Sequence, residues 1–487
     1  MSLKELLCSI WRFFLKLYFG YLRRMNEVSQ THGVNYILDE RLHPLERLVW
    51  VVIVISAFCG AISIGSNQLG RYNANPTVIS LERDYHDWNG TMPAVTFCYV
   101  DRLSPEAVEV FLETKWNITP SHKEYPFFSR FIESVSNISV MNLQAFDEFA
   151  FDEQLRSADF LEITKAAFDE FAFDEQLRSA DFLEITKAVV PIFEQYISNF
   201  DRTAQLDAVP IVTEKGLCYS VNSPLTPIFS VANRKPHQEN EIPVREPLSC
   251  KYTKNQCFLK IDVYGFRLSS VFVHSPFEIP LGDTQAPSLE PTDEITATYR
   301  IIETTADDSV RELSVSQRNC LFYDEKIRRL PSYSLNLCTM ECRARAALNA
   351  CGCKPFFYPF VQGPDCNVEG IFCLNRLSWP ERTKGTCDCP KPCLDLLYIP
   401  NSYKVESWDV GEEGIPFAQK STFRLEILPA KMRNRREVLF TFEDLLVSLG
   451  AATSLFIGIS FYNMLHGLLL HFELVIEIIQ WCRGRRS

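Results

Sequence analysis

The sequence predicts a membrane protein in which two transmembrane helices flank a large, disulfide-rich α+β extracellular domain. Two apolar runs without acidic or basic residues lie near the ends of the 487-residue chain. Fourteen of the seventeen cysteines lie between Cys98 and Cys393. An even number of cysteines in one segment is typical of a disulfide framework, which persists in oxidising compartments. We therefore expect the middle of the chain outside the cytosol and both ends inside.

The first apolar run extends from Leu48 to Gly70 without a charged residue. About 20 mainly apolar residues suffice to cross a bilayer as a helix. Charged residues precede the run, and it begins too far from the N-terminus for an ordinary cleaved signal peptide. We expect residues 47–68 to form a retained signal anchor, and a buried core helix is the alternative.

The second run, Leu445 to Phe472, carries no charge except through possible protonation of His466 and His471. At 1.5 Å per residue its length is roughly 42 Å, longer than a hydrocarbon core of about 30 Å. A helix over 441–480 must therefore tilt, break or begin outside the membrane.

Basic residues flank both outer ends of the two predicted spans. Because positive charge stays on the cytoplasmic side, residues 1–46 and 481–487 are expected there and 69–440 outside. Three glycosylation sequons, at Asn89, Asn117 and Asn137, lie in the predicted outer segment, as acceptors of glycans must. The basic flanking residues are Arg12, Lys16, Arg23, Arg24, Arg41, Arg47, Arg483, Arg485 and Arg486.

The predicted outer domain mixes strands and helices. Short β-like runs occur at 295–302 and 421–428, separated by Pro, Gly and Asn. Helical patterns occur at 106–114, where Ser104 and Pro105 are suited to a helix start, and at 334–350.

A 22-residue segment is repeated letter for letter, first at 145–166 and again at 167–188. Each copy has six acidic and two basic residues, so the two copies supply −8 of the net charge of −12. A recent duplication or a gene-model error explains a perfect copy, and an acidic sensor loop is the alternative. The overall charge disfavours nucleic acid as a partner, because phosphate binding needs a basic face.

Ten cysteines lie within residues 320–393. Their close pairs are C-x3-C and C-x-C, whereas zinc ribbons favour C-x2-C, so disulfides are favoured over a metal module. Cys338 and Cys342 are one helical turn apart, and Cys387 and Cys389 share one side of an extended strand. A helix bridged to a strand in this way is stiff. The ten are Cys320, Cys338, Cys342, Cys351, Cys353, Cys366, Cys373, Cys387, Cys389 and Cys393.

The second apolar run carries a stripe of small residues at helical spacing, Gly450, Ser454 and Gly458. Such stripes let membrane helices approach closely, and helix packing alone is one interpretation. The other is a pore, because Gly458-Ile459-Ser460 can break the helix and present carbonyls and a hydroxyl to an ion. Two helices per chain cannot enclose a pore, so a channel needs several subunits.

The chain resembles the degenerin/epithelial sodium channel family, and most of all its arthropod pickpocket-type branch. Thr31-His32-Gly33 is similar to the family's cytoplasmic His-Gly gating motif. Residues 93–98, Pro-Ala-Val-Thr-Phe-Cys, resemble the signature after the first span. Gly458-Ile459-Ser460 falls on the Gly-x-Ser selectivity filter, and Glu443 and Asp444 open the second span at the expected pore mouth.

The resemblance implies a trimeric, voltage-independent, amiloride-sensitive sodium channel, homo- or heteromeric, in the plasma membrane of sensory or epithelial cells. The ectodomain would be a clenched hand of palm, thumb, finger, knuckle and β-ball. Sodium is the permeant ion, and no cofactor or metal is implied. The ladder would pair Cys320–Cys393, Cys338–Cys389, Cys342–Cys387, Cys351–Cys373 and Cys353–Cys366. Cys98 would pair with Cys218, and Cys250–Cys257 then follows by elimination.

The sequence departs from the family pattern near the filter. Val447 stands eleven positions before Gly458, where relatives have a small residue and bulk favours the open state. His466 stands where an acidic residue is usual, and Glu473 follows two helical turns later. An insertion around 462–469 would account for this shift and for the length of the run.

Other classes of function fit the sequence less well. Motifs typical of serine hydrolases, zinc proteases and phosphate-binding loops do not occur, so we expect no enzyme. A two-pass receptor or adhesion protein explains the cysteines but not the small-residue stripe. An ATP-gated trimeric channel lacks the cysteine ladder. A non-conducting auxiliary subunit remains an alternative, and the gating stimulus cannot be read from the residues.

Overall fold

The computed structural model forms two compact units. The two-helix unit comprises residues 1–78, 308–318 and 437–487, and the sheet unit comprises 79–307 and 319–436. The described residues are 32–39, 41–85, 88–149, 180–201, 203–231, 246–251, 256–325, 332–383, 385–407, 420–458, 460, 462, 465–466, 468–469, 471–473, 475–476 and 479. The predicted N-terminal segment before His32 and the tail 481–487 thus lie outside the described residues.

The two-helix unit is built on α3, which spans Pro44–Ala74. Pro44 occupies the first helical turn, and the ring of His43 accepts a hydrogen bond from the Leu45 N–H at 3.3 Å. The helix is longer than the expected 47–68. Its polar last turn is stabilised by aromatic contacts, because the Arg71 guanidinium lies 5.2 Å from the centre of the Phe440 ring.

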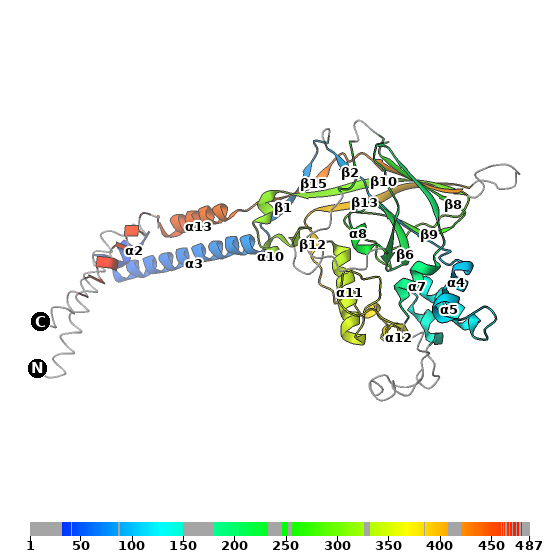
Figure 1. Ribbon diagram of the computed structural model, residues 1–487. Helices are drawn as coiled ribbons and strands as arrows, with labels where there is room; N and C mark the ends of the chain where they lie inside the picture. Colours follow the sequence, from blue (N-terminus) through cyan, green and yellow to red (C-terminus); the bar gives the residue numbers. More distant parts are fainter. Residues whose placement is uncertain are drawn as a thin grey trace, which may run out of the picture. The chain divides into compact units, whose positions relative to one another are not determined.

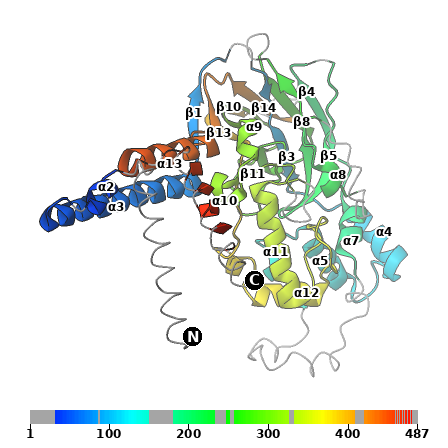
Figure 2. The same ribbon diagram turned by 90° about the vertical axis from the view of Figure 1, so that its left-hand side faces the viewer.

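Besides α3 and the helical residues between 462 and 479, the described part of the two-helix unit contains four labelled helices. Figures 1 and 2 show α3 and α13 running side by side. Glycines on α3 permit this approach, since a Cβ on Gly60 would lie 3.0 Å from the Phe456 ring and one on Gly65 would lie 3.2 Å from Leu449. The four helices are α2 (Val34–Leu38), α9 (Asp308–Arg311), α10 (Val315–Arg318) and α13 (Phe442–Ile457).

Among the described residues, α3 is the one helix both long and apolar enough to cross a membrane. The described part of α13 has 16 residues and ends at Ile457. The residues described between 462 and 479 are helical as well. A second span over 441–480 therefore stays a prediction.

The sheet unit contains a seven-stranded sheet with the order β1-β15-β10-β14-β8-β4, in which β13 also pairs with β10. The 14-residue strand β10 is central, because it runs parallel to β14 and β15 and antiparallel to β13. The strands are β1 (Thr77–Glu82), β4 (Glu194–Asn199), β8 (Phe258–Tyr264), β10 (Asp293–Ala306), β13 (Asp395–Ser407), β14 (Lys420–Leu428) and β15 (Arg433–Val438).

A second, four-stranded sheet has the order β5-β6-β3-β9. Its core residues Val95 and Phe97 belong to the same buried cluster as Ile261 and Leu425 of the larger sheet, so one hydrophobic core joins the two. Two short strand pairs, β2–β7 and β11–β12, complete the strands. Their bounds are β2 (Gly90–Thr91), β3 (Ala94–Tyr99), β5 (Val209–Thr213), β6 (Gly216–Val221), β7 (Ser249–Cys250), β9 (Leu268–His274), β11 (Cys320–Leu321) and β12 (Lys391–Pro392).

Helices α4, α5 and α7 lie together in both ribbon views (Figures 1 and 2). As expected, Ser104 and Pro105 begin α4, and the Ser104 hydroxyl accepts a hydrogen bond from the Ala107 N–H at 3.3 Å. Aromatic rings join this group, with Phe131 near both Phe149 and Phe182. The bounds are α4 (Pro105–Trp116), α5 (Tyr125–Ser136), the 3-10 helix η1 (Leu143–Phe149) and α7 (Phe182–Val189).

The two ends of the duplicated segment 145–188 are part of this helical group. The first copy begins within η1, and the second copy ends in α7. The rings of Phe146 and Phe182 stack with their centres 5.4 Å apart. The beginning of the first copy therefore packs against the end of the second copy. The intervening residues 150–179 lie outside the described residues.

The ten clustered cysteines form a disulfide ladder beside helix α11 (Leu335–Cys351), which begins at the Ser334 cap. Shorter helices follow it, α12 (Val368–Arg376) and the 3-10 helix η2 (Glu381–Thr383), while α8 (Thr226–Phe229) precedes β7. The described residues form seven disulfides, of which six are the pairs that the resemblance implies and Cys250–Cys257 is the pair expected by elimination. They are Cys98–Cys218, Cys250–Cys257, Cys320–Cys393, Cys338–Cys389, Cys342–Cys387, Cys351–Cys373 and Cys353–Cys366.

A partly buried carboxyl group, that of Glu278, lies at the start of α11. Burial raises the pKa of Glu278 to about 7, and the negative charge of Asp395 adds to this rise. The backbone N–H groups of Leu335 and Asn336 act in the opposite direction but do not compensate. Glu278 therefore binds its proton more tightly in the folded protein than in the unfolded chain.

We predict that the stability of the protein falls as the pH rises through 7, because Glu278 must then ionise at a partly buried position. The contribution is complete below the ordinary pKa of 4.5 and is lost as pH rises through about 7. Glu278→Gln should remove roughly 2 kcal/mol of this pH dependence. Thermal unfolding of the detergent-solubilised chain between pH 5 and 8 measures it, with Glu109→Gln as control. Parallel pH profiles for Glu278→Gln and the unmodified protein would contradict the assignment.

Candidate functional site

Helix α13 has two faces with different surroundings. Leu445 and Ala452 are buried, and Leu449 and Phe456 are the side chains next to Gly65 and Gly60 of α3. Their spacing of four, three and four residues places all four on one helix face. Bulky side chains of α13 therefore pack against α3.

The opposite face of α13 carries the small residues that the sequence singled out. Gly450 and Ser454 are exposed, and Val447 is 72% exposed. A Cβ added at Gly450 would meet no atom within 4 Å. Gly450 and Ser454 of the small-residue stripe thus take no part in packing against α3, and Gly458 is half-buried.

The two acidic residues expected at a pore mouth, Glu443 and Asp444, have different environments at the start of α13. The Asp444 carboxylate accepts a hydrogen bond from the Thr441 N–H at 2.9 Å, and the Thr441 hydroxyl accepts one from the Asp444 N–H at 3.2 Å. This capping box gives Asp444 a structural role at the helix end. Glu443 is exposed and lies at helical spacing from Val447, on the open face.

Helix α13 ends at the proposed filter. Gly458 has a φ of +76°, a left-handed conformation that glycine adopts readily, and its N–H donates to the Ser454 carbonyl at 3.0 Å. Ser460 is exposed and outside the helix, whereas Ile459 lies outside the described residues. The small residues thus lead directly to a break in the helix.

The His-Gly motif reaches this break from the N-terminal side of the chain. The His32 N–H donates to the Ile457 carbonyl at 2.9 Å. Gly33 has a φ of +83°, and a Cβ there would lie 2.7 Å from Val54 of α3. Next to the turn, Tyr36 of α2 stacks on Trp50 of α3 with ring centres 4.4 Å apart. The sequence indicated the motif but not this contact, which joins residues 425 positions apart.

The structure also describes predicted residues for which no contact with the helix break at Gly458 is observed. His466 and Glu473 are both helical, and Glu473 is exposed. The sequon residues Asn89, Asn117 and Asn137 are all exposed, so each is sterically open to a glycan. Among the described residues, no group of three or more His, Cys, Asp or Glu side chains is placed to bind a metal ion.

We predict that Gly33→Ala destabilises the two-helix unit. An L-residue at this positive φ costs about 1–2 kcal/mol, and the added methyl group collides with Val54. Thermal unfolding of the full chain in detergent measures the loss. Gly70→Ala is the matched control because its Cβ would meet nothing within 4 Å. Equal stability of the two variants would mean that the turn at Gly33 is not held in this conformation.

Comparisons with known proteins show that this chain is similar to sodium channels and related ion channels. A model of the amiloride-sensitive sodium channel family matches residues 26–465. Sodium channel protein Nach of Drosophila melanogaster is 23% identical over 498 residues, covering 94% of this chain and 88% of the relative. The bile acid-sensitive ion channel of Rattus norvegicus is 23% identical over 385 residues, covering 76% of this chain and 68% of the relative.

A shorter match supports the same relationship. Pickpocket protein 28 of Drosophila melanogaster is 26% identical over 141 residues, covering 28% of this chain and 23% of the relative. The family match spans well over half of the 487 residues and includes both the His-Gly turn and the break at Gly458. The chain therefore belongs to the amiloride-sensitive sodium channel family, the degenerin/epithelial sodium channel family.

Proposed function

We propose that the chain is one subunit of a trimeric, amiloride-sensitive, sodium-selective channel of the plasma membrane, in which α13 lines the pore. Family membership supports a sodium channel subunit rather than an enzyme. The open face of α13 is the single observation that carries the pore assignment. Its residues Val447, Gly450 and Ser454 are exposed while the opposite face packs on α3.

The proposed topology has two spans and cytoplasmic ends, with α3 as an outer wall. The second span begins with α13 and continues beyond Ser460 to about residue 480. The disulfide ladder would be the thumb of a clenched-hand ectodomain, and the exposed sequons would carry glycans. Seven disulfides and three exposed acceptor asparagines support placing the sheet unit in an oxidising, extracellular environment.

Ion selection is assigned to Gly458, Ile459 and Ser460. A helix that ends in lipid leaves carbonyl groups without intrahelical partners, and such groups are tolerated where they line an aqueous path. The Ile457 carbonyl already accepts the His32 N–H, so the remaining carbonyls and the Ser460 hydroxyl are the candidates for replacing an ion's water. The same bond links the His-Gly motif to the filter and supports a gating role for His32 and Gly33.

Val447 and Glu443 are assigned to the outer part of the proposed pore. Glu443 would attract cations to the mouth, since a carboxylate there raises their local concentration. The bulk of Val447, at a position where the family usually has a small residue, would favour the open state. The stimulus, whether a ligand or mechanical force, and homo- or heteromeric assembly are left open.

A non-conducting auxiliary subunit and a cysteine-rich receptor are the alternatives. Both accommodate the disulfides and the sequons. Neither explains why a bulky face of α13 packs on α3 while a small-residue face ends at a glycine in the left-handed conformation. The conducting subunit is the better-supported function for this reason.

We predict that Ser460→Ala changes the preference of the channel for sodium over potassium. The removed hydroxyl would be one of the groups that replace water around the ion, so the permeability ratio should change about threefold or more. The reversal potential of the amiloride-sensitive current measures it, with the chain expressed alone or with a related subunit. Ser56→Ala is the control, because the Ser56 hydroxyl donates to the Val52 carbonyl within α3 at 2.8 Å. Unchanged selectivity with normal current would exclude Ser460 from the filter.

A further inference from the structure

A buried carboxylate lies at the tip of the β5–β6 hairpin. Thr213 pairs with Gly216, so Glu214 and Lys215 form the two-residue turn. Hairpin turns usually lie on the surface, and a glutamate is almost never fully buried without partners. Here the Glu214 side chain is 0% exposed. The turn must therefore be covered by groups that satisfy the charge.

Three groups from other segments contact the two carboxylate oxygens of Glu214. Arg343 of α11 forms an ion pair with one oxygen at 2.6 Å, and the Gly282 N–H donates to the same oxygen at 2.7 Å. The Tyr358 hydroxyl donates to the other oxygen at 2.6 Å. Arg343 is itself only 5% exposed and reaches Asp283 with a second nitrogen at 3.2 Å.

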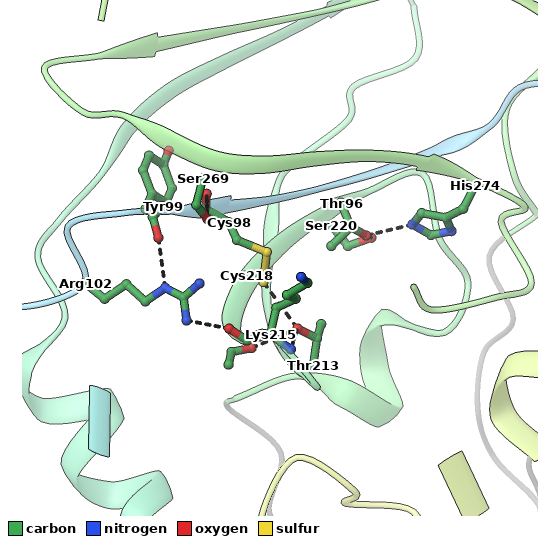
Figure 3. Close-up of a disulfide and its surroundings, with 11 residues drawn as sticks. Thr96, Cys98, Tyr99, Arg102, Thr213, Lys215, Cys218, Ser220, Ser269 and His274 are labelled. Carbon is green, nitrogen blue, oxygen red and sulfur yellow. Dashed lines mark hydrogen bonds between the residues drawn. A yellow bond between two sulfur atoms is a disulfide. The ribbon is translucent and has the colours of Figure 1, made fainter. Parts of the chain in front are cut away.

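The backbone of the same turn holds the segment that carries α4 and α5. The Glu214 carbonyl accepts the Val140 N–H at 2.8 Å. The Lys215 carbonyl accepts a hydrogen bond from the Arg102 guanidinium at 2.5 Å, and Arg102 also donates to the Tyr99 carbonyl at 2.8 Å. Figure 3 shows Arg102 spanning Tyr99 and Lys215 next to the Cys98–Cys218 disulfide.

The turn thus joins three parts of the sheet unit that are far apart in sequence. Arg102 and Val140 flank α4 and α5, Gly282 and Asp283 belong to the β9–β10 connection, and Arg343 and Tyr358 belong to the disulfide ladder. Charged hydrogen bonds are short and directional, whereas apolar contacts are not. A junction of this kind resists sliding and transmits a displacement of the ladder to β5 and β6.

Stability alone does not require charges at this position. Replacing a buried ion pair by apolar groups of similar volume is often neutral or stabilising, whereas removing one partner leaves an uncompensated buried charge. The pair gives directional attachment rather than net stability. A variant that removes both charges can therefore lose the directional attachment while it keeps its stability, which makes the role of the junction testable.

We infer that Glu214 and Arg343 are positioning residues for gating. Their ion pair, here called the latch, attaches the disulfide ladder to the β5–β6 hairpin so that the two move together. The inference rests on the proposed channel function, since a moving ladder matters only if it acts on a gate. It concerns residues that touch neither the ion nor α13.

The test compares the double variant Glu214→Gln/Arg343→Met with a matched control in the full chain. Removing both charges avoids an unpaired buried ion, so the double variant should reach the cell surface within about twofold of the unmodified chain. Its amiloride-sensitive current per surface subunit should change at least threefold. The control, Lys115→Met/Glu184→Gln, removes an exposed ion pair of 2.5 Å between α4 and α7 and should leave that current unchanged. An unchanged current in the double variant would overturn the inference.

A milder variant tests the same inference if the double variant does not fold. Tyr358→Phe keeps both charges and removes one hydrogen bond to Glu214, and its current per surface subunit should shift in the same direction by a smaller factor. No shift in Tyr358→Phe would count against the latch.

Hydrogen exchange of the purified chain distinguishes failure of the latch from failure of the channel proposal. Loss of the latch should accelerate exchange at least threefold in both 209–221 and 335–351 relative to the control. Accelerated exchange without any current in the unmodified chain would retain the latch and reject conduction. Unchanged exchange in both segments would reject the latch, whatever the current.

Discussion

The break in α13 at Gly458 is the constraint on which the two-helix unit depends. A helix end frees backbone carbonyls, and inside a bilayer each must find a partner or water. One partner is the His32 N–H, which approaches the Ile457 carbonyl to 2.9 Å. That approach requires the chain to turn sharply at Gly33 and α2 to lie on α3. The His-Gly motif and the end of α13 therefore form one structural feature.

The same constraint gives α13 its two faces. One face packs on glycines of α3, and among the described residues no atom lies within 4 Å of a Cβ added at Gly450 on the other face. In the proposed trimer, small side chains toward the axis leave room for a hydrated ion, and Gly458 ends the helix where that ion must lose its water. In this proposal, one face of α13 packs against α3 and the other face lines the path of the ion.

The sheet unit combines covalent and electrostatic attachment. Each disulfide contributes on the order of 2–4 kcal/mol, so the five rungs beside α11 make the ladder stiff. None of those rungs connects α11 to the β5–β6 hairpin, and Glu214 and Arg343 make that connection through buried charge. Stiffness within the ladder and directional attachment at its side are complementary properties of an element that transmits motion.

Much of this architecture could be predicted from local patterns. The apolar run indicated α3, Ser104-Pro105 indicated the start of α4, and cysteine spacing indicated a segment bridged to a helix. The expected strand at Cys387 and Cys389 was wrong, because both residues precede β12 and belong to no strand. Contacts between distant residues could not be predicted in this way. The predicted span 47–68 ended before Arg71 and Tyr72, yet both residues lie within α3, where they contact Phe440 and Phe442. The sequence placed Asp444 at a pore mouth but did not indicate that its carboxylate also caps α13.

The Glu214–Arg343 pair illustrates the same limit. The partners are 129 positions apart, and neither residue stands out in the sequence. Burial of a turn residue is set by the elements that pack over it, and no local pattern records those elements. The small-residue stripe was ambiguous for a related reason, because spacing defines a helix face but not what the face contacts.

The most direct test of the central claim compares the two faces of α13 by cysteine accessibility. In a Cys59→Ser background, since Cys59 is an exposed free cysteine, Val447→Cys and Leu449→Cys are each treated from outside with a charged thiol reagent. A pore along the open face predicts that the reagent alters the current of Val447→Cys channels and leaves Leu449→Cys channels unaffected. Modification of Leu449→Cys with no effect at Val447→Cys would place the pore on the other face and contradict the account.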